Sequence, residues 1–332
     1  MKVNIFDVAK KSGLSVVTVS RVLNNAPTVR PGNRAKVLRA MEELNYYPNA
    51  SARSLASGRT GVIGLTITTL NDTVFDAMVK VINQRLSDHG YFLALSISSG
   101  GEGAFQRSMF QEDRVDGVIL LSPVDAHSYI EELMNRSIPF VVLDDQQQHA
   151  TTTSVNVNNY KGGYEAARHL IELGHTQISH IRGPRPQQSS ADRERGMLDA
   201  LAEAGLDLFD SQIGDFDIPS GYRIAQAWIE AGRLPTAIFA ADDYMAIGAM
   251  DACKNAGIQI PEELSIIGFD DQQFASQFTP ALTTIAQPYE QVALQGVDLL
   301  LAAIRNAEPQ AASLLFDPQL IVRHSTAAPR NR

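Results

Sequence analysis

Aspartates recur within a few residues after short apolar runs that have the composition of buried strands. They are Asp72, the pair Asp144 and Asp145, the pair Asp242 and Asp243, and the pair Asp270 and Asp271. A carboxylate accepts several hydrogen bonds, so a set of them suits recognition of the hydroxyl groups of a sugar-like molecule. For any single aspartate, capping of the next helix explains the position equally well. Their recurrence at matching positions favours one shared binding site for a small polar molecule.

Sequence motifs of the common enzyme classes are missing. There is no Gly-x4-Gly-Lys-Ser/Thr phosphate loop, no Gly-x-Ser-x-Gly turn and no His-Glu-x2-His zinc motif. His169, His175 and His180 lack metal-ligand spacing, and Cys253 lies in an apolar-periodic segment that favours a buried thiol. A glycosidase needs only two opposed carboxylates, so an enzyme on the same fold stays an alternative. We expect no catalysis, no metal and no cofactor.

The elements that must position the aspartates are short apolar runs separated by amphipathic stretches. The runs are 62–67, 92–97, 115–121, 140–143, 178–181, 237–240 and 264–269. Strands that alternate with helices predict an α/β fold with doubly wound parallel sheets. Such sheets bind ligands at the carboxyl ends of their strands, where the aspartates lie.

Charge divides the chain into a basic start and an acidic remainder. Residues 1–60 hold ten lysines and arginines against three acidic residues, which leaves 18 and 34 for residues 61–332. A basic head on an acidic body is typical of a protein that binds the phosphates of DNA. The first residues contain no apolar run of the length that a secretory signal needs, so we expect a cytoplasmic, nucleoid-associated protein.

The first sixty residues predict three short helices. Val8, Ala9, Leu14, Val19 and Val22 give one apolar face to each of two helices, with a turn at Gly13 and a cap at Ser15. A third helix is expected over 31–44, with Ala35, Leu38, Met41 and Leu44 on its buried face and Pro31 at its first position. This is the pattern of a helix-turn-helix, whose second helix enters the major groove of DNA.

Three side chains are expected to project from the second helix toward DNA. Arg21 would contact a guanine or a phosphate, while Val16 and Val17 can make only apolar contacts, for example with thymine methyl groups.

Two strings make the resemblance to a known family specific. Ile5-Phe-Asp-Val-Ala-x3-Gly13-x-Ser15-x2-Thr18-Val-Ser-Arg-Val-Leu-Asn24 and Asn45-Tyr-Tyr-Pro-Asn49-Ala-x-Ala-Arg-Ser-Leu55 resemble the LacI/GalR family of lactose and galactose repressors. The resemblance implies a headpiece over 1–48, a hinge helix or linker over 49–60 and a core over 61–332 that binds an effector and dimerises. The DNA contacts it implies are Ser15, Val16, Val17, Thr18, Ser20, Arg21, Asn24, Asn49, Ala52, Arg53 and Leu55.

The hinge is too short to be a stable isolated helix, so its folding can depend on DNA and on the partner subunit. Leu55 matches the leucine that the family inserts into the minor groove, where an apolar wedge kinks the duplex. Packing of Leu55 against the core is the alternative. One departure lies in Val29-Arg30-Pro31-Gly32, which has no hydroxyl to cap the third helix.

The resemblance continues through the core. It rests on Gly174-His175, Gly183-Pro184, Arg193-Glu-Arg-Gly196, Gly214-Asp-Phe216, Ala240-Ala-Asp-Asp243, Met245-Ala-Ile-Gly248, Ile267-Gly-Phe-Asp270, Thr279-Pro-Ala-Leu-Thr-Thr284, Gln287-Pro288 and Leu320 to Thr326. It implies a two-lobed periplasmic-binding-protein-like core in which the chain crosses between the lobes three times. We expect one lobe over about 61–160 plus 291–322, and the other over about 161–290 plus 323–332.

The effector positions of that fold, together with the first aspartate, are Asp72, Phe75, Asp144, Arg193, Phe216, Asp242, Asp270 and Gln287. Asp72-Thr-Val-Phe75 replaces an aromatic run of many relatives, and Asp242 replaces a common asparagine. Several carboxylates around one arginine disfavour anionic effectors such as sugar phosphates, and purines with them, and they favour a neutral mono- or oligosaccharide.

The prediction is therefore a homodimeric, sequence-specific DNA-binding regulator, most simply a repressor, that responds to a small sugar-like effector on a pseudo-palindromic operator. Two alternatives share the core: a sugar-binding protein without a DNA function, and an enzyme on a doubly wound sheet. The sequence leaves open whether the effector releases the protein from DNA or recruits it.

Overall fold

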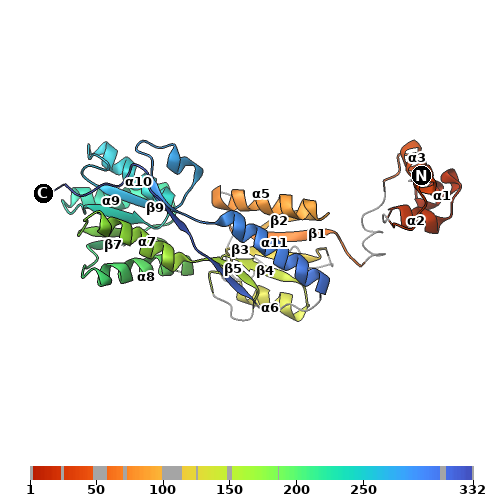
Figure 1. Cartoon of the computed structure of the whole chain (residues 1–332), viewed down its shortest axis with the longest axis horizontal. Coiled ribbons are helices and arrows are strands. Elements are labelled where there is room, and N and C mark those ends of the chain that lie inside the picture. Colours follow the sequence, from red (N-terminus) through yellow and green to blue (C-terminus); the bar gives the residue numbers. More distant parts are fainter. Residues whose placement is uncertain are drawn as a thin grey trace. The chain divides into compact units, whose positions relative to one another are not determined.

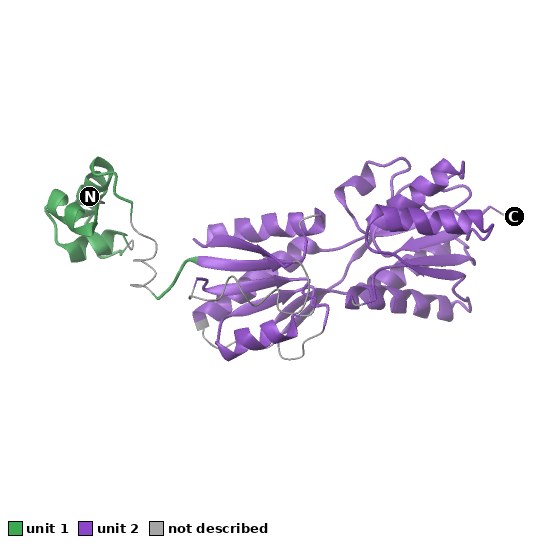
Figure 2. Ribbon diagram, turned by 180° about the vertical axis from the view of Figure 1, so that it is seen from behind, with its two compact units in different colours: residues 1–61 green, residues 62–332 purple. Residues whose placement is uncertain are grey.

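The chain forms two compact units, residues 1–61 and residues 62–332 (Figure 2). The computed structural model describes residues 3–23, 26–47, 58–69, 73–98, 114–124, 126–147, 152–185, 187–306 and 312–330. None of the helices within these ranges combines the length and apolarity needed to cross a bilayer.

The first unit contains three helices, α1 (Ile5–Ser12), α2 (Val16–Leu23) and α3 (Pro31–Glu43). Its core consists of the buried side chains of Val8, Ala9, Val19, Val22, Val37 and Ala40. The apolar faces expected of the first two helices are therefore confirmed. Gly13 ends α1 in the left-handed conformation with φ 69°, which glycine adopts without a steric penalty.

The expected buried face of α3 was wrong. Leu38 is 52% exposed and Ala35 is exposed too, whereas Val37 and Ala40 are buried, with Met41 and Leu44 packed partly against the core. Positions 37, 40, 41 and 44 follow the i, i+3, i+4, i+7 spacing of one helical face. A strict three-residue step drifts around a helix that has 3.6 residues per turn, which is why positions 35 and 38 leave the core.

The first lobe of the second unit is built on a parallel sheet with strand order β11-β5-β4-β3-β1-β2. The strands are β1 (Val62–Ile67), β2 (Phe92–Ile97), β3 (Gly117–Leu121), β4 (Phe140–Leu143), β5 (Ser154–Val157) and β11 (Ser313–Phe316). Helices α5 (Thr73–Asp88) and α11 (Tyr289–Asn306) pack on one apolar core, and α6 (His127–Asn135) packs on a second.

The second lobe repeats this arrangement with strand order β12-β10-β9-β8-β6-β7, in which only β12 among the described strands is antiparallel. The strands are β6 (Ile178–Arg182), β7 (Asp210–Ile213), β8 (Ala237–Ala240), β9 (Ser265–Asp270), β10 (Thr283–Ala286) and β12 (Gln319–Ile321). Helices α7 (Asn159–Glu172) and α8 (Gln188–Glu203) share one apolar core, and α9 (Ile218–Glu230) and α10 (Asp243–Asn255) share another. A short 3-10 helix, η1 (Gln273–Ser276), follows β9.

The chain changes lobe three times, after β5, after β10 and after β11 (Figure 1). The third change falls between Phe316 and Gln319, a few residues before the expected boundary at 322. β4 belongs to the first-lobe sheet, and β8 and β9 are parallel neighbours in the second-lobe sheet. The aspartates at the carboxyl ends of these three strands, Asp144, Asp242 and Asp270, lie close to one another.

Candidate DNA interface and effector cavity

The N-terminus of α1 is fixed by a reciprocal capping box that the sequence reading missed. The Asn4 side chain accepts hydrogen bonds from the backbone N–H groups of Phe6 and Asp7, and Asp7 Oδ2 accepts one from the Asn4 N–H at 2.9 Å. Asparagine followed three residues later by aspartate was the available signal. Ser15 caps α2, because its Oγ accepts a hydrogen bond from the Thr18 N–H at 3.2 Å.

The three side chains expected to project from α2 do not share one environment. Val17 is 62% exposed and Arg21 is exposed as well, whereas Val16 packs partly against the headpiece core. Thr18 and Ser20 are half-buried. Val17 and Arg21 are therefore the two predicted contacts within α2 whose side chains are exposed to solvent. Asn24, Asn49, Ala52, Arg53 and Leu55 lie outside the described residues.

A cavity of about 500 Å³ lies in the second unit, with walls from both lobes. Seven of the eight predicted effector positions line it, namely Phe75, Asp144, Arg193, Phe216, Asp242, Asp270 and Gln287. Asp72 lies outside the described residues. The sequence reading missed other polar and aromatic lining residues, among them Thr69, Ser122, Gln187, Ser189, Asp215, Asp217, Tyr244 and Tyr289. The size is typical of a site for one small organic molecule.

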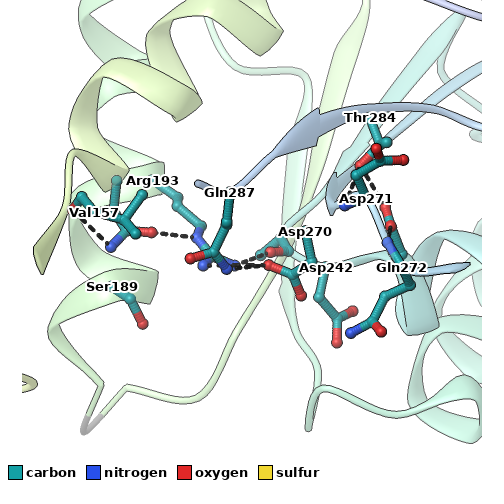
Figure 3. A network of polar contacts seen from close by, with 12 residues as sticks. Val157, Ser189, Arg193, Asp242, Asp270, Asp271, Gln272, Thr284 and Gln287 are labelled. Atoms are coloured by element: carbon teal, nitrogen blue, oxygen red, sulfur yellow. Dashed lines mark hydrogen bonds and ion pairs between the residues drawn. The ribbon is translucent and has the colours of Figure 1, made fainter. Parts of the chain in front are cut away.

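Arg193 is held in place from several sides (Figure 3). Its Nε donates to Asn159 Oδ1 at 2.8 Å, and its Nη1 donates to the Ala241 carbonyl. Its Nη2 lies 3.6 Å from Asp270 Oδ1. Arg193 is 5% exposed, and these contacts fix the orientation of its guanidinium while they use two of its five N–H donors.

Asp270 and Gln287 form a pair at the end of β9. Gln287 Nε2 donates to Asp270 Oδ1 at 2.5 Å (Figure 3). Asp270 has φ 111°, a conformation that non-glycine residues rarely adopt, so the backbone is held there by its surroundings. The carboxylate of this strained residue lines the cavity. Strained backbone conformations are commonly found at binding sites.

The two members of each aspartate pair have different roles. Asp144, Asp242 and Asp270 line the cavity, whereas the second member of each pair makes structural bonds. Asp243 accepts hydrogen bonds from Thr284 Oγ1 at 2.6 Å and from the Gln272 N–H at 2.7 Å. Asp271 forms an ion pair with Arg323, and Asp145 accepts from the Gln147 N–H. Asp242 is also the N-cap of α10, so capping and cavity lining coexist in one residue.

Burial governs the ionisation of these carboxyls. Desolvation raises the pKa of Asp144, and it raises the pKa of Asp243 well above its ordinary value. The nearby charge of Asp270 acts in the same direction on Asp243. An additional negative charge in the cavity would meet the same repulsion.

Phe216 forms an aromatic wall that depends on a glycine opposite. A Cβ at Gly183 would lie 2.1 Å from Phe216 Cζ, so a larger residue at position 183 would displace the ring from its present position. Phe75 lines the cavity from the other lobe. Trp228 packs in the core of the second lobe, and its Nε1 donates to Asp210 Oδ2.

Metal or thiol chemistry has no support in the described part of the chain. No cluster of three or more histidine, cysteine, aspartate or glutamate residues there has the arrangement of a metal site. Cys253 is buried, and burial raises the pKa of its thiol to about 12, so it is not a nucleophile at neutral pH.

Both structural units match known protein families. Residues 4–49 match the family of bacterial regulatory proteins, lacI family, and residues 167–326 match the periplasmic binding protein-like domain. The HTH-type transcriptional repressor PurR of Edwardsiella ictaluri (strain 93-146) is 36% identical over 97% of this chain and 96% of its own length.

Two solved structures extend the comparison. A Lac repressor dimer bound to operator and the anti-inducer ONPF has a TM-score of 0.90 at 30% identity, covering 99% of this chain and 100% of that one. A complex of the transcriptional regulator CelR with cellobiose has a TM-score of 0.75 at 28% identity, covering 98% and 100%. With a matching headpiece, a matching core and full-length relatives that are transcription regulators, the chain belongs to the LacI family and is a DNA-binding transcriptional repressor.

Proposed function

We propose that a neutral sugar bound in the cavity between the lobes controls the affinity of this repressor for its operator. The observation that carries the proposal is the charge of the cavity. Among its described lining residues, Asp144, Asp215, Asp217, Asp242 and Asp270 are acidic, and Arg193 is the only basic one. A neutral, hydroxyl-rich molecule can donate hydrogen bonds to these carboxylates without adding charge.

An anionic effector is disfavoured by the way in which Arg193 is used. Its guanidinium already has the Asp270 carboxylate as a counter-charge, with Nη2 3.6 Å from Oδ1, so a phosphate would compete with Asp270 for the one basic group of the described lining. A phosphate would also approach several carboxylates in a partly enclosed site, where repulsion between like charges is weakly screened. Phe75 and Phe216 offer apolar ring surfaces to the C–H groups of a sugar.

On DNA, α2 is proposed to lie in the major groove, with Val17 and Arg21 facing the bases or phosphates. The family resemblance assigns further contacts to Ser15, Val16, Thr18, Ser20, Asn24, Asn49, Ala52 and Arg53, and it assigns the minor-groove wedge to Leu55. Two headpieces of a homodimer would occupy the half-sites of a pseudo-palindrome.

Coupling between the two sites requires that the effector prefer one arrangement of the lobes. The lobes are joined near the cavity by Gln146 of the first lobe, whose Oε1 accepts hydrogen bonds from Ser189 N–H at 3.1 Å and Ser189 Oγ at 3.0 Å. A sugar that contacts both lobes stabilises the joined arrangement, and the spacing of the two hinges then changes with the lobe angle.

Calorimetry tests the effector class. The titrants are a panel of neutral sugars, the corresponding sugar phosphates, and purine bases. We expect a neutral sugar to bind more tightly than its phosphate by at least about tenfold. Tighter binding of a sugar phosphate than of its parent sugar, or of a purine than of every sugar, would contradict the proposal.

A further inference from the structure

A second cavity, of about 270 Å³, adjoins the first at the lobe junction. The two cavities share three lining residues, Asp144, Val157 and Ser189. The second one continues past them between the edge of the first-lobe sheet and the first turns of α8. The residues that line only the second cavity include Asp145, Gln146, Thr152, Ser154, Asn156, Gln188, Asp192, Ser313 and Leu315.

The alternation of side chains along β5 and β11 explains why their polar residues face the second cavity and not the apolar core. In the pair of β5 and β11, Ser154 lies opposite Ser313, and Asn156 lies opposite Leu315. All four line the second cavity, whereas the intervening Val155, Leu314 and Phe316 pack in the core under α5 and α11. Side chains of a strand point alternately to its two faces, so these four form one continuous patch.

The polar side chains of the patch are fixed in orientation by bonds among themselves. Ser154 Oγ lies 3.2 Å from Ser313 Oγ, and Asn156 Nδ2 donates to Ser154 Oγ at 3.0 Å. Asn156 Oδ1 accepts from the Asp145 N–H at 2.8 Å. A wall of pre-oriented hydroxyl, amide and carboxylate groups recognises a ligand without a large entropy cost.

The composition of the second cavity selects the chemistry of an occupant. Except for Val157 and Leu315, its described lining residues are polar, and none of them is lysine or arginine, so an anion has no counter-charge there. Its aspartates do not converge as metal ligands within the described residues, which disfavours a cation. Leu315 is 61% exposed and provides an apolar surface beside hydroxyl and amide groups, a combination that suits a sugar ring.

We propose that the effector site extends past Asp144 into this second cavity, which holds a second sugar unit, so that the effector is a disaccharide or a longer saccharide. This inference rests on the proposed control by a neutral sugar and specifies its size. The first unit of the sugar occupies the cavity around Arg193 and Asp270, and the next unit lies against Ser154, Asn156 and Ser313. The saccharide passes the Gln146–Ser189 bond that joins the lobes.

The test compares disaccharides with their own constituents. Calorimetric titrations of the full-length protein use cellobiose, maltose, lactose and sucrose together with glucose, galactose and fructose. They are repeated on Leu315→Trp, which fills the second cavity from an exposed position, and on Ser313→Ala, which removes one hydroxyl. Val322→Trp is the matched control, because Val322 is 58% exposed and does not line either cavity.

We expect one disaccharide to bind at least about tenfold more tightly than either of its constituents. Leu315→Trp should remove most of this advantage and Ser313→Ala part of it, while Val322→Trp retains it. If a monosaccharide binds as tightly as every disaccharide, or if the advantage survives Leu315→Trp, the second cavity is not a sugar subsite, although binding of a neutral sugar to the protein stands. If no sugar of the series binds, both proposals fail together.

Discussion

The guanidinium of Arg193 stacks on the ring of Phe269, with Cζ 3.6 Å from the ring centroid. The ring is in turn pressed against α7, where a Cβ at Gly162 would lie 2.5 Å from Phe269 Cε2. A cation over an aromatic face is stabilised further when it is desolvated. The stack therefore holds the guanidinium of Arg193 against β9. The position of Arg193 in the cavity depends on β9 and α7 as much as on α8, which carries the residue.

Asp270→Ala is expected to lower effector affinity by about 10- to 100-fold, because the effector loses a buried, charge-assisted acceptor and Gln287 loses its partner. The measurement is calorimetric titration with the sugar found in the panel. Operator affinity without effector should stay within about twofold of the wild type. Asp251→Ala, on the exposed side of α10, is the control. Equal loss of sugar and operator binding by a folded Asp270→Ala protein would contradict the assigned role.

Arg21→Ala is expected to weaken operator binding by about tenfold. If Arg21 contacts a phosphate, the slope of the logarithm of the binding constant against the logarithm of the salt concentration also falls in magnitude by about one. If Arg21 contacts a guanine, the variant loses discrimination at one base pair of the operator. Fluorescence anisotropy at several salt concentrations separates these outcomes. Arg168→Ala removes an exposed arginine of α7 and serves as the control. Unchanged affinity of Arg21→Ala would remove this side chain from the interface.

Gly196→Ala is expected to destabilise the second lobe by about 3 kcal/mol or more. A Cβ at this position would lie 1.9 Å from the Tyr160 carbonyl oxygen, so α7 and α8 would have to separate. Urea denaturation followed by the fluorescence of Trp228, which packs in the second lobe, gives the change. Gly32→Ala in α3 is the matched control, because a Cβ there meets nothing within 4 Å. A midpoint for Gly196→Ala equal to that of the control would show that the helices do not cross this closely.

The burial of His180 predicts that the free energy of unfolding depends on pH. Its ring is fully buried, its Nδ1 lies 2.8 Å from the Phe239 carbonyl oxygen, and burial lowers its pKa from 6.5 to about 4. Between these two pH values the unfolded chain binds more protons at this residue than the folded protein does. The free energy of unfolding therefore falls as the pH is lowered through this window, by about 3 kcal/mol for the full shift, and the contribution is fully present above pH 6.5.

The raised pKa of Asp243 acts in the opposite direction, so the contribution of His180 is measured as a difference. Urea titrations of the wild type and His180→Leu between pH 4 and 7 should show a smaller loss of stability on acidification in the variant. His324→Leu controls for removal of an exposed imidazole. Parallel pH profiles of the wild type and His180→Leu would contradict this assignment.

Much of the architecture could be predicted from the sequence, because most strands are short apolar runs. β1, β3, β4, β6, β8 and β9 are inner strands and largely buried, and the edge strand β2 is apolar although it is partly exposed. All seven fall within a few residues of their predicted positions. The strands missed were β5, β7, β10, β11 and β12, which are only three or four residues long and each contain polar side chains, as in Ser154–Val157 and Asp210–Ile213. Such strands are recognisable only through their neighbours, since their pairing and not their composition makes them strands.

The site was predictable where a carboxyl end of a strand and a family motif coincided. The family resemblance named the first aspartate of each pair, and these are the three that line the cavity. The partners that hold Asp243 and Asp271 outside the cavity, Thr284 and Arg323, were not predictable because they lie far away in sequence. The second cavity was missed for a similar reason. Its wall comes from β5 and β11, which lie about 160 residues apart and meet only in the sheet.

The most direct test of the account is the affinity of the full-length protein for an operator selected from a genomic fragment library, measured at fixed salt with and without each neutral sugar of the panel. We expect one neutral sugar to change the affinity by at least about tenfold, and we expect Asp270→Ala to abolish the response while it retains operator binding. No response to any neutral sugar, together with a response to a sugar phosphate or a purine, would contradict the account.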